Sequence, residues 1–559
     1  MELLDSRRLT GPNILSDQPG AIIDVRLGPD ETDPLVSEWR AAARAMLDAV
    51  GWTASALHVR RMAGGASLGF DAPIDALYAA TEINDWAFEA ARRQVAGEHT
   101  PPFSEDADRL AKLIEEELNP ELIGLRDAAI EHDLPFLSDD DHASVGFGCC
   151  SRTWPVDSLP APQDVPWDEL GKIPVGLITG TNGKTTTVRL AAAMVAAAGK
   201  VVGLSSTDRV VVGKDTVDVG DYAGPGGARE VLRHRDVEIA VLETARGGLL
   251  RRGAAMQRAD AAVLTNIAAD HLDDFGVQDL AALADVKWLV TRVLGDTGTA
   301  VLNAEDPRLV ERAMGLRCPI TWFALEADAV NNLAGDHPLR AFVMDDGHIT
   351  LLDGDRRQSL IPVTEVPITL DGAARHNVAN CLAAMGLADA LGIPVEAMLD
   401  ALRETTHAAN PGRGNLYEID GARVLVDFAH NPHGVGALRP VAEHFGQRRR
   451  VLLIGQAGDR GDEAIHQLAD AAWQLRPDKI IIKEMGRYSR GRQEGEVARL
   501  LYRLFVEAGA DPDSVSYQAE EIDGVKAAID WAEPGDLAIL LVHEDIAGVV
   551  EFVRAASED

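Results

Sequence analysis

The chain has 559 residues, of which 46% are hydrophobic and 25% are charged, and its formal net charge is −36. This length exceeds what one hydrophobic core supports, so roughly two to four domains of an ordinary globular protein are expected. The negative charge argues against nucleic acid as a partner, because phosphate backbones are bound by basic patches. It suits either a cationic small substrate or a surface that keeps the protein in solution.

Membrane insertion and disulfide bonding are not expected either. The apolar runs are too short for a membrane span, and the N-terminus lacks the basic-then-apolar order of a signal peptide, so we expect a cytoplasmic protein. The four cysteines, Cys149, Cys150, Cys318 and Cys381, show no spacing typical of a metal site. Adjacent cysteines rarely bridge, so reduced thiols are expected.

Residues 1–165 are predicted to form an N-terminal α+β domain. Its pattern indicates a strand over 21–27 and amphipathic helices over 35–49, 74–96 and 105–117. Two turn-rich segments, 8–13 and 139–148, are either structural loops or parts of a site. The domain would hold a substrate or mediate self-association, and we expect a homo-oligomer. A linker punctuated by Pro155, Pro160, Pro162 and Pro166 follows.

The rest of the chain alternates between short strands and helices. In residues 166–410 the predicted strands are 174–179, 201–206, 237–243, 261–266, 298–302 and 319–324, with a small hairpin insert over 341–370. This alternation predicts a mainly parallel sheet with helices on both faces. Residues 411–559 are predicted to form a second, Rossmann-like unit with strands 423–428, 450–454, 479–483, 515–518 and 537–542. The expected fold is therefore α/β with three domains.

A glycine-rich loop lies between the strand 174–179 and a helical segment over 188–198. This order places backbone N–H groups at a helix N-terminus, where phosphate oxygens bind. Lys184 would neutralise the outer phosphates, and the Thr185 hydroxyl would complete a Mg²⁺ shell. The general pattern has a further glycine where this chain has Ile178, and a plain turn is the alternative. The residues expected to bind the nucleotide here are Gly180, Thr181, Asn182, Gly183, Lys184, Thr185 and Thr186.

Candidate metal ligands follow two of the predicted strands. Glu243 ends the strand 237–243, and His271 comes shortly after the strand 261–266. Ligands bind at the carboxyl ends of strands in open α/β sheets, and a carboxylate and an imidazole beside a phosphate loop suit Mg²⁺. Taken singly, Glu243 could be a surface acid and His271 a turn residue. Together with Thr185 they predict a metal site.

Several motifs of the sequence resemble known ligases. Those similar to the ATP-dependent Mur ligases are Gly180–Thr186, Thr265–His271, Leu302–Pro307, Gly372–Asn380, Asp427–Pro432 and Gly455–Arg460. Gly220–Pro225, Leu242–Leu249 and Arg490–Glu496 resemble the Mur-ligase portion of cyanophycin synthetase in particular. The likeness covers residues 170–559, and Leu9–Ile14 also looks like that enzyme's opening segment. The ATP-grasp domain that cyanophycin synthetase carries between these parts has no counterpart here.

This resemblance implies a two-step reaction that uses ATP and Mg²⁺. ATP phosphorylates a small-molecule carboxylate to an acyl phosphate, and an amine then displaces phosphate to form an amide. An amino acid would be joined to an amino-acid or peptide carboxylate. Two alternatives are an accessory ligase that acts on preformed cyanophycin-like oligopeptides and a catalytically silent nucleotide-binding scaffold.

The resemblance also implies roles for individual residues. Lys287 matches a family lysine that is carbamylated and binds metal; a solvated helix lysine is the alternative. Arg413 would reach the ATP phosphates once the domains close, whereas Asp427 and His430 would join Lys184, Glu243, His271 and Lys287 in catalysis. Asp459 and Arg460 would serve the same interface or form an ordinary turn. The residues expected to contact the nucleotide are Asn266, Asn303, His376, Asn377 and Asn380. For His376, Asn377 and Asn380, helix capping is the alternative.

Overall fold

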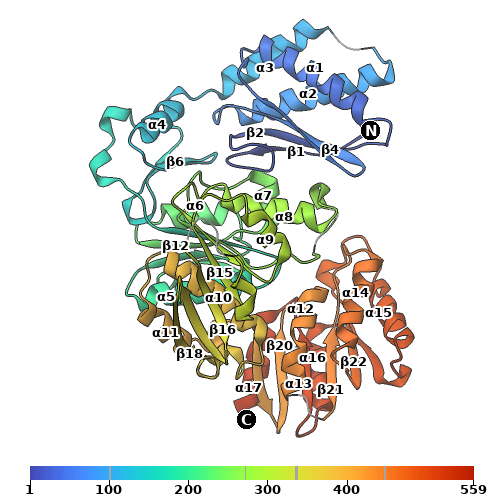
Figure 1. Ribbon diagram of the computed structural model, residues 1–559. Helices are drawn as coiled ribbons and strands as arrows, with labels where there is room; N and C mark the ends of the chain where they lie inside the picture. Colours follow the sequence, from blue (N-terminus) through green and yellow to red (C-terminus); the bar gives the residue numbers. More distant parts are fainter. Residues whose placement is uncertain (100–101, 271, 273, 334–337, 446–447, 559) are drawn as a thin grey trace.

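The computed structural model describes residues 1–559 except 100–101, 271, 273, 334–337, 446–447 and 559. Three parts follow one another along the chain, from the N-terminal part in blue to the C-terminal part in orange and red (Figure 1). The described residues form sheets of four, eleven, six and three strands. Among the described residues, no helix is both long enough and apolar enough to cross a bilayer.

The N-terminal part is a four-stranded antiparallel sheet with helices on one face. The strand order is β1-β2-β4-β3, and the strands are β1 (Glu2–Leu9), β2 (Gly20–Arg26), β3 (Leu57–Met62) and β4 (Gly65–Asp71). Trp39 of α1 (Thr32–Ala49) and Ile83 of α2 (Leu77–Ala96) are buried against this sheet, which leaves its other face toward the rest of the molecule (Figure 1). The remaining elements are α3 (Phe103–Glu117), α4 (Pro120–Glu131) and a small sheet of β5 (Phe136–Ser138), β6 (His142–Val145) and β7 (Arg152–Pro155).

The segments 8–13 and 139–148 fasten this part to the middle of the chain. Arg8 forms an ion pair with Asp140 at 2.7 Å, which joins the two segments to each other, and Asp139 pairs with Arg233 of α6 (Pro225–Arg233) in the middle part. The backbone of Thr10 donates to the carbonyl of Arg252 in α7 (Arg246–Arg252) at 2.8 Å. Both segments therefore serve as structural contacts between parts of the chain.

The middle part is built on an eleven-stranded sheet. Its order is β11-β10-β9-β12-β8-β13-β14-β15-β16-β17-β18. In this spatial order, the run of strands that begins at β9 and ends at β16 is parallel. Successive residues of a strand alternate between two cores, as Leu177 and Ile178 of β8 do, because neighbouring side chains of a strand point to opposite faces of the sheet. The strands are β8 (Val175–Thr179), β9 (Val202–Ser205), β10 (Arg209–Val212), β11 (Asp215–Val219), β12 (Ile239–Glu243), β13 (Ala261–Leu264), β14 (Thr299–Asn303), β15 (Ile320–Ala324), β16 (Arg340–Asp345), β17 (His348–Asp353) and β18 (Arg356–Pro362).

Helices cover both faces of this sheet. The helices α5 (Lys184–Ala197), α10 (Arg375–Ala390) and α11 (Val395–Glu404) pack on one face. The helices α6, α7, α8 (Leu280–Trp288) and α9 (Pro307–Ala313) pack on the other.

The C-terminal part is a six-stranded sheet of order β19-β20-β24-β21-β22-β23, parallel except for β19. Its strands are β19 (Arg413–Ile419), β20 (Ala422–Asp427), β21 (Arg450–Ile454), β22 (Lys479–Lys483), β23 (Val515–Gln518) and β24 (Leu537–Leu541). The helices are α12 (Pro432–Ala437), α13 (Arg439–Phe445), α14 (Asp462–Trp473), α15 (Glu496–Glu507), α16 (Glu521–Trp531) and α17 (Ile546–Glu558). They form two cores, one on each face.

The predicted α/β fold is confirmed, with three differences in detail. The large sheet is mixed, because the hairpin of β10 and β11 adds antiparallel strands at one edge. The hairpin predicted over 341–370 is present as β16, β17 and β18, but these strands extend the large sheet. Helix α5 begins at Lys184, four residues before the predicted start at 188.

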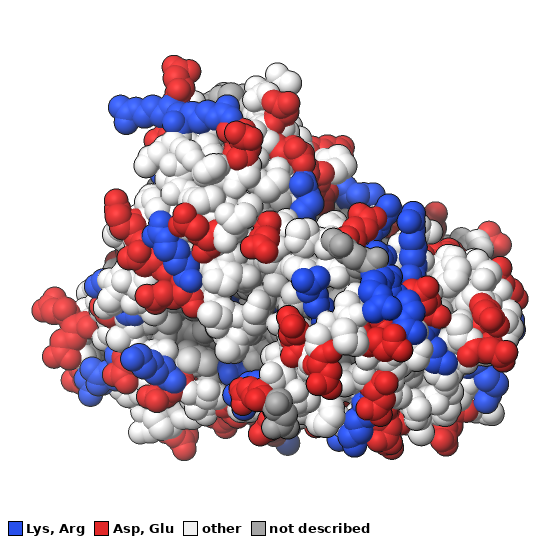
Figure 2. Space-filling view, turned by 90° about the horizontal axis from the view of Figure 1, so that it is seen from below, with Lys and Arg blue, Asp and Glu red and all other residues white. Residues whose placement is uncertain are grey.

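The surface carries charges of both signs. Figure 2 shows acidic and basic side chains interspersed over one face of the molecule. This distribution is typical of a solubilising surface, which is one of the two interpretations of the net charge of −36.

Candidate active site

The phosphate loop joins β8 to α5 and depends on two glycines. Gly180 has φ +149° and Gly183 has φ +85°, a region in which other residues are strained. A Cβ atom on Gly180 would lie 1.8 Å from Oγ1 of Thr265, and one on Gly183 would lie 2.2 Å from Oδ1 of Asn380. The Lys184 ammonium donates to the Thr181 carbonyl at 3.0 Å, so it folds back over the loop.

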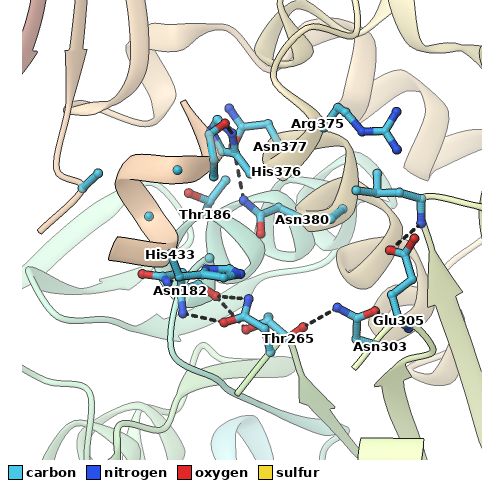
Figure 3. Close-up of a pocket in the computed structure, with 18 of the residues that line it drawn as sticks. Asn182, Thr186, Thr265, Asn303, Glu305, Arg375, His376, Asn377, Asn380 and His433 are labelled. Carbon is cyan, nitrogen blue, oxygen red and sulfur yellow. Dashed lines mark hydrogen bonds between the residues drawn. The ribbon is translucent and has the colours of Figure 1, made fainter. Parts of the chain in front are cut away.

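A second segment holds the loop in shape. The Thr265 hydroxyl donates to the Asn182 carbonyl at 2.7 Å, and the Asn182 N–H donates to Oδ1 of Asn266 at 3.0 Å. Nδ2 of Asn303 donates in turn to the Thr265 carbonyl at 2.9 Å (Figure 3). Asn266 and Asn303 therefore brace the loop and also line the cavity described below.

The carboxylate of Glu243 lies beside Thr185 at the carboxyl end of β12. The Thr185 hydroxyl donates to Oε2 of Glu243 at 2.9 Å, and the Thr207 hydroxyl donates to Oε1 at 2.6 Å. Glu243 is only 2% exposed, which excludes the surface-acid alternative. Hydroxyl and carboxylate oxygens are hard donors, so this pair fits Mg²⁺. His271, the third predicted ligand, lies outside the described residues.

Lys287 is buried in α8 and points at the phosphate loop. Its side chain is enclosed in the core, and Nζ donates to the Gly180 carbonyl at 2.7 Å. Burial, together with the nearby Lys184 ammonium, holds the pKa of Lys287 well below its usual value. The alternative of a solvated helix lysine is therefore wrong. A neutral amine is the form that can react with carbon dioxide to give a carbamate.

A cavity of about 580 Å³ lies between the middle and C-terminal parts. The phosphate loop contributes Asn182 and Gly183 to its wall, and α10 contributes His376, Asn377 and Asn380 (Figure 3). Asn380 donates to Oδ1 of Asn377 at 3.2 Å, and burial lowers the pKa of His376. Helix α10 is capped at Ala374 without a side-chain hydrogen bond, so the capping alternative for these asparagines is wrong.

The C-terminal part closes the other side of the cavity with residues at the start of β19 and at the end of β20. Arg413 lies opposite Asp427 in the strand pairing, and its guanidinium stacks on the Phe428 ring with its carbon 4.2 Å from the ring centroid. Burial raises the pKa of Asp427 and lowers that of Arg413. Together with His430, both residues line the cavity.

Polar contacts join the two parts across the cavity. Nε2 of His430 lies 3.4 Å from the carboxylate of Asp270, and Arg460 pairs with the same carboxylate at 3.0 Å. Nδ2 of Asn182 lies 2.9 Å from Nδ1 of His433 and 3.2 Å from Oδ1 of Asn431. Asp459 instead pairs with Arg490 within the C-terminal part. The phosphate loop is thus in direct contact with the C-terminal part.

Comparison with protein families matches both of these parts. The Mur ligase middle domain matches residues 178–388, and the Mur ligase glutamate ligase domain matches residues 412–541. The chain belongs to the Mur ligase family. This family consists of ATP-dependent ligases that join acids to amino acids.

Relatives of this Mur ligase include enzymes with several substrates. Cyanophycin synthetase of Crocosphaera subtropica is 36% identical over 407 residues, which are 72% of this chain and 45% of that protein. UDP-N-acetylmuramoylalanine–D-glutamate ligase of Chlorobium luteolum is 32% identical over 293 residues, which are 51% of this chain and 56% of that protein. The chain thus spans about half the length of these curated relatives.

The same fold occurs in a solved structure. FolC of E. coli in complex with ADP superposes with a TM-score of 0.50 and 19% identity, over 69% of this chain and 90% of that chain. At this identity the likeness shows the fold alone.

Some residues of this Mur ligase site were not predicted individually. Thr207 follows β9, whose carboxyl end lies beside that of β12, so strand order alone could have suggested it. Asn431 lies in the Asp427–Pro432 motif, and His433 directly follows that motif. Their place in or beside this motif is the signal that could have identified them. Thr265 begins the motif Thr265–His271, but its contact with a loop more than eighty residues away has no local signal in the sequence.

Proposed function

We propose that this chain is a cytoplasmic, ATP- and Mg²⁺-dependent ligase that forms an amide between a carboxylate and an amino-acid amine. The observation that carries the proposal is the cavity of about 580 Å³ that brings the phosphate loop together with Arg413, Asp427 and His430. Charges of both signs, held by two different domains, surround a space that can take a nucleotide and a second small molecule.

The metal would be held by Thr185 and Glu243, with His271 as a third ligand. The oxygen donors of the first two fit a hard cation. A bound Mg²⁺ would neutralise charge on the triphosphate and on the substrate carboxylate, which otherwise repel one another. A carbamate on Lys287 would add a further oxygen near the phosphate loop.

The chain's own residues support a two-step transfer. In the first step a carboxylate oxygen attacks the γ-phosphorus, the bond to the bridging oxygen breaks, and ADP leaves. Lys184 and the loop N–H groups would stabilise the charge that builds up on the phosphoryl oxygens. In the second step the amine nitrogen attacks the acyl carbon, phosphate leaves, and the nitrogen loses a proton.

Closure between the two domains would exclude water from the acyl phosphate. Such an intermediate is rapidly lost to hydrolysis if water enters. The contacts of Asp270 with His430 and Arg460, and of Asn182 with Asn431, support a closed arrangement. Arg413 and Asp427 would then contact the reacting groups.

The substrates are proposed from the relatives. Cyanophycin synthetase and the peptidoglycan ligases suggest an amino-acid amine and an amino-acid or peptide carboxylate. The N-terminal part would hold the carboxylate substrate or mediate self-association into a homo-oligomer. An accessory ligase on preformed oligopeptides is a second candidate, because the two matched domains together make up a single ligase site.

The proposal is tested by a screen of acids and amines for release of ADP and phosphate, with mass spectrometry of the products. Free amino acids and preformed acidic peptides are tried in separate arms, which distinguishes the two candidates. One ADP released for each amide formed supports the proposal. ATP binding without turnover in any arm would favour a nucleotide-binding scaffold.

A further inference from the structure

Asn410 lies in the segment that joins α11 to β19, and its side chain contacts the phosphate-loop helix. The residue is 1% exposed. Nδ2 donates to Oγ1 of Thr186 at 3.0 Å, and Oδ1 accepts from Nη1 of Arg189 at 2.8 Å. A guanidinium can only donate, so the amide oxygen must face Arg189 and the amide nitrogen must face Thr186.

The position of Arg189 is fixed by its own partner. Its guanidinium pairs with Asp208 at 2.5 Å, and Asp208 also accepts from the Ser206 hydroxyl at 2.7 Å. Burial lowers the pKa of Arg189, but the Asp208 carboxylate opposes this and the guanidinium stays charged. Arg189 lies one turn along α5 from Thr186, and its ion pair with Asp208 therefore sets the orientation of the Asn410 amide.

This orientation determines where the Thr186 hydroxyl can donate. A hydroxyl has one proton, and Oγ1 of Thr186 already accepts from Asn410. The proton is left for another acceptor, and Thr186 lines the cavity next to the phosphate loop (Figure 3). A phosphate oxygen of a bound nucleotide is such an acceptor.

The backbone of Asn410 is connected to the other side of the cavity. Its carbonyl accepts from the Arg413 N–H at 3.2 Å and from Nδ2 of Asn415 at 3.0 Å. Asn415 is fully buried, and its Oδ1 accepts from the Gly412 N–H. One residue thus contacts both the helix that follows the phosphate loop and the segment that carries Arg413.

We propose that Asn410 is a positioning residue that aims the Thr186 hydroxyl at a nucleotide phosphate and couples nucleotide binding to the segment that carries Arg413. The inference rests on the proposed function, since that function supplies the nucleotide. It assigns the joining segment a part in sensing the nucleotide in addition to connecting two domains.

The test is a double-mutant cycle on the affinity for Mg·ADP, measured with a fluorescent ADP analogue. Asn410→Ala should weaken binding about three- to tenfold, the range expected for one lost hydrogen bond. In a Thr186→Val background the same change should have less than about a twofold effect, because the hydroxyl it directs is gone. Asn331→Ala, at an exposed asparagine, is the matched control and should bind like wild type.

A second measurement follows hydrogen exchange of residues 410–415. Mg·ADP should slow this exchange in the wild type but not in Asn410→Ala. A purely structural asparagine would lower the melting temperature without changing the response to nucleotide. If Asn410→Ala does not fold, Asn410→Leu removes the donor at similar volume.

The outcomes separate this inference from the proposed function. Equal losses of affinity in the wild-type and Thr186→Val backgrounds would overturn the positioning role. A response of the 410–415 amides to nucleotide that persists in Asn410→Ala would overturn the coupling. A wild-type protein that binds no Mg·ADP would overturn the proposed function and, with it, the ligand on which this inference depends.

Discussion

Replacing Lys287 by alanine or by methionine tests the role of the buried amine. Both changes remove the hydrogen bond of 2.7 Å to the Gly180 carbonyl, which contributes about 0.5–1.5 kcal/mol to stability. Methionine keeps most of the side-chain volume, whereas alanine leaves a space in the core beside α8. Loss of one metal-binding oxygen should lower metal affinity about 10- to 100-fold, judged from changes around other metal sites.

The assay is ADP release as a function of Mg²⁺ concentration. Both variants should need more Mg²⁺ and turn over slowly. Short carboxylic acids should partly restore the alanine variant, because they fit the vacated space and supply an oxygen, but should not restore the methionine variant. The wild type should depend on bicarbonate and carry the mass of a carbamate on Lys287. Lys112→Ala, at an exposed lysine of α3, is the control.

Two results would contradict this reasoning. If Lys287→Ala keeps wild-type turnover at low Mg²⁺, the amine serves only to hold the Gly180 carbonyl. If the same carboxylic acids rescue both variants, they do not act by binding in the space left by alanine, because the methionine variant lacks that space.

Three further predictions concern the loop, the product and pH. Lys184→Ala should abolish ADP release while the circular dichroism spectrum stays unchanged. Among the described residues, the only hydrogen bond that the Lys184 ammonium donates is to the Thr181 carbonyl, so its loss should cost little stability. A folded variant with near-native turnover would contradict the phosphate-loop assignment. The purified chain should form one amide per substrate carboxylate, and size analysis that finds long polymer would require a second active site. Burial, with Lys483 and His430 nearby, holds the pKa of His543 well below 6.5. As the pH falls below about 6.5, His543 therefore binds a proton in the unfolded chain but not in the folded chain. Stability should therefore fall with acidification by up to about 1.4 kcal/mol per pH unit from this group, and His543→Gln should show a shallower fall in chemical denaturation at pH 7 and pH 5; equal slopes would mean that His543 is protonated in the folded state.

Local pattern in the sequence was enough for the parts of the site that are continuous in the chain. The strand, glycine loop and helix around Gly180 to Thr186 are encoded by apolar residues, by glycines with positive φ and by helix-forming residues, all within a short segment. The same holds for Glu243, because a parallel strand ends there and its carboxyl end is where ligands bind.

Two strands at the edges of the sheets, β1 and β11, could not be predicted in this way. β1 has an irregular burial pattern, and β11 is exposed throughout. Neither strand shows the alternation that identifies a strand with one buried face, so local pattern predicts neither of them.

The sequence by itself determined the Mur ligase family, the phosphate loop and several of the residues that line the cavity. Only the tertiary structure decided that Lys287 is buried against Gly180, that Asn410 donates a hydrogen bond to Thr186, and that His430 and Arg460 both contact the Asp270 carboxylate. These contacts join residues from about a hundred to more than two hundred positions apart. A local period specifies which face of an element is buried, but not which distant polar group meets it, because that depends on how the sheets and domains pack.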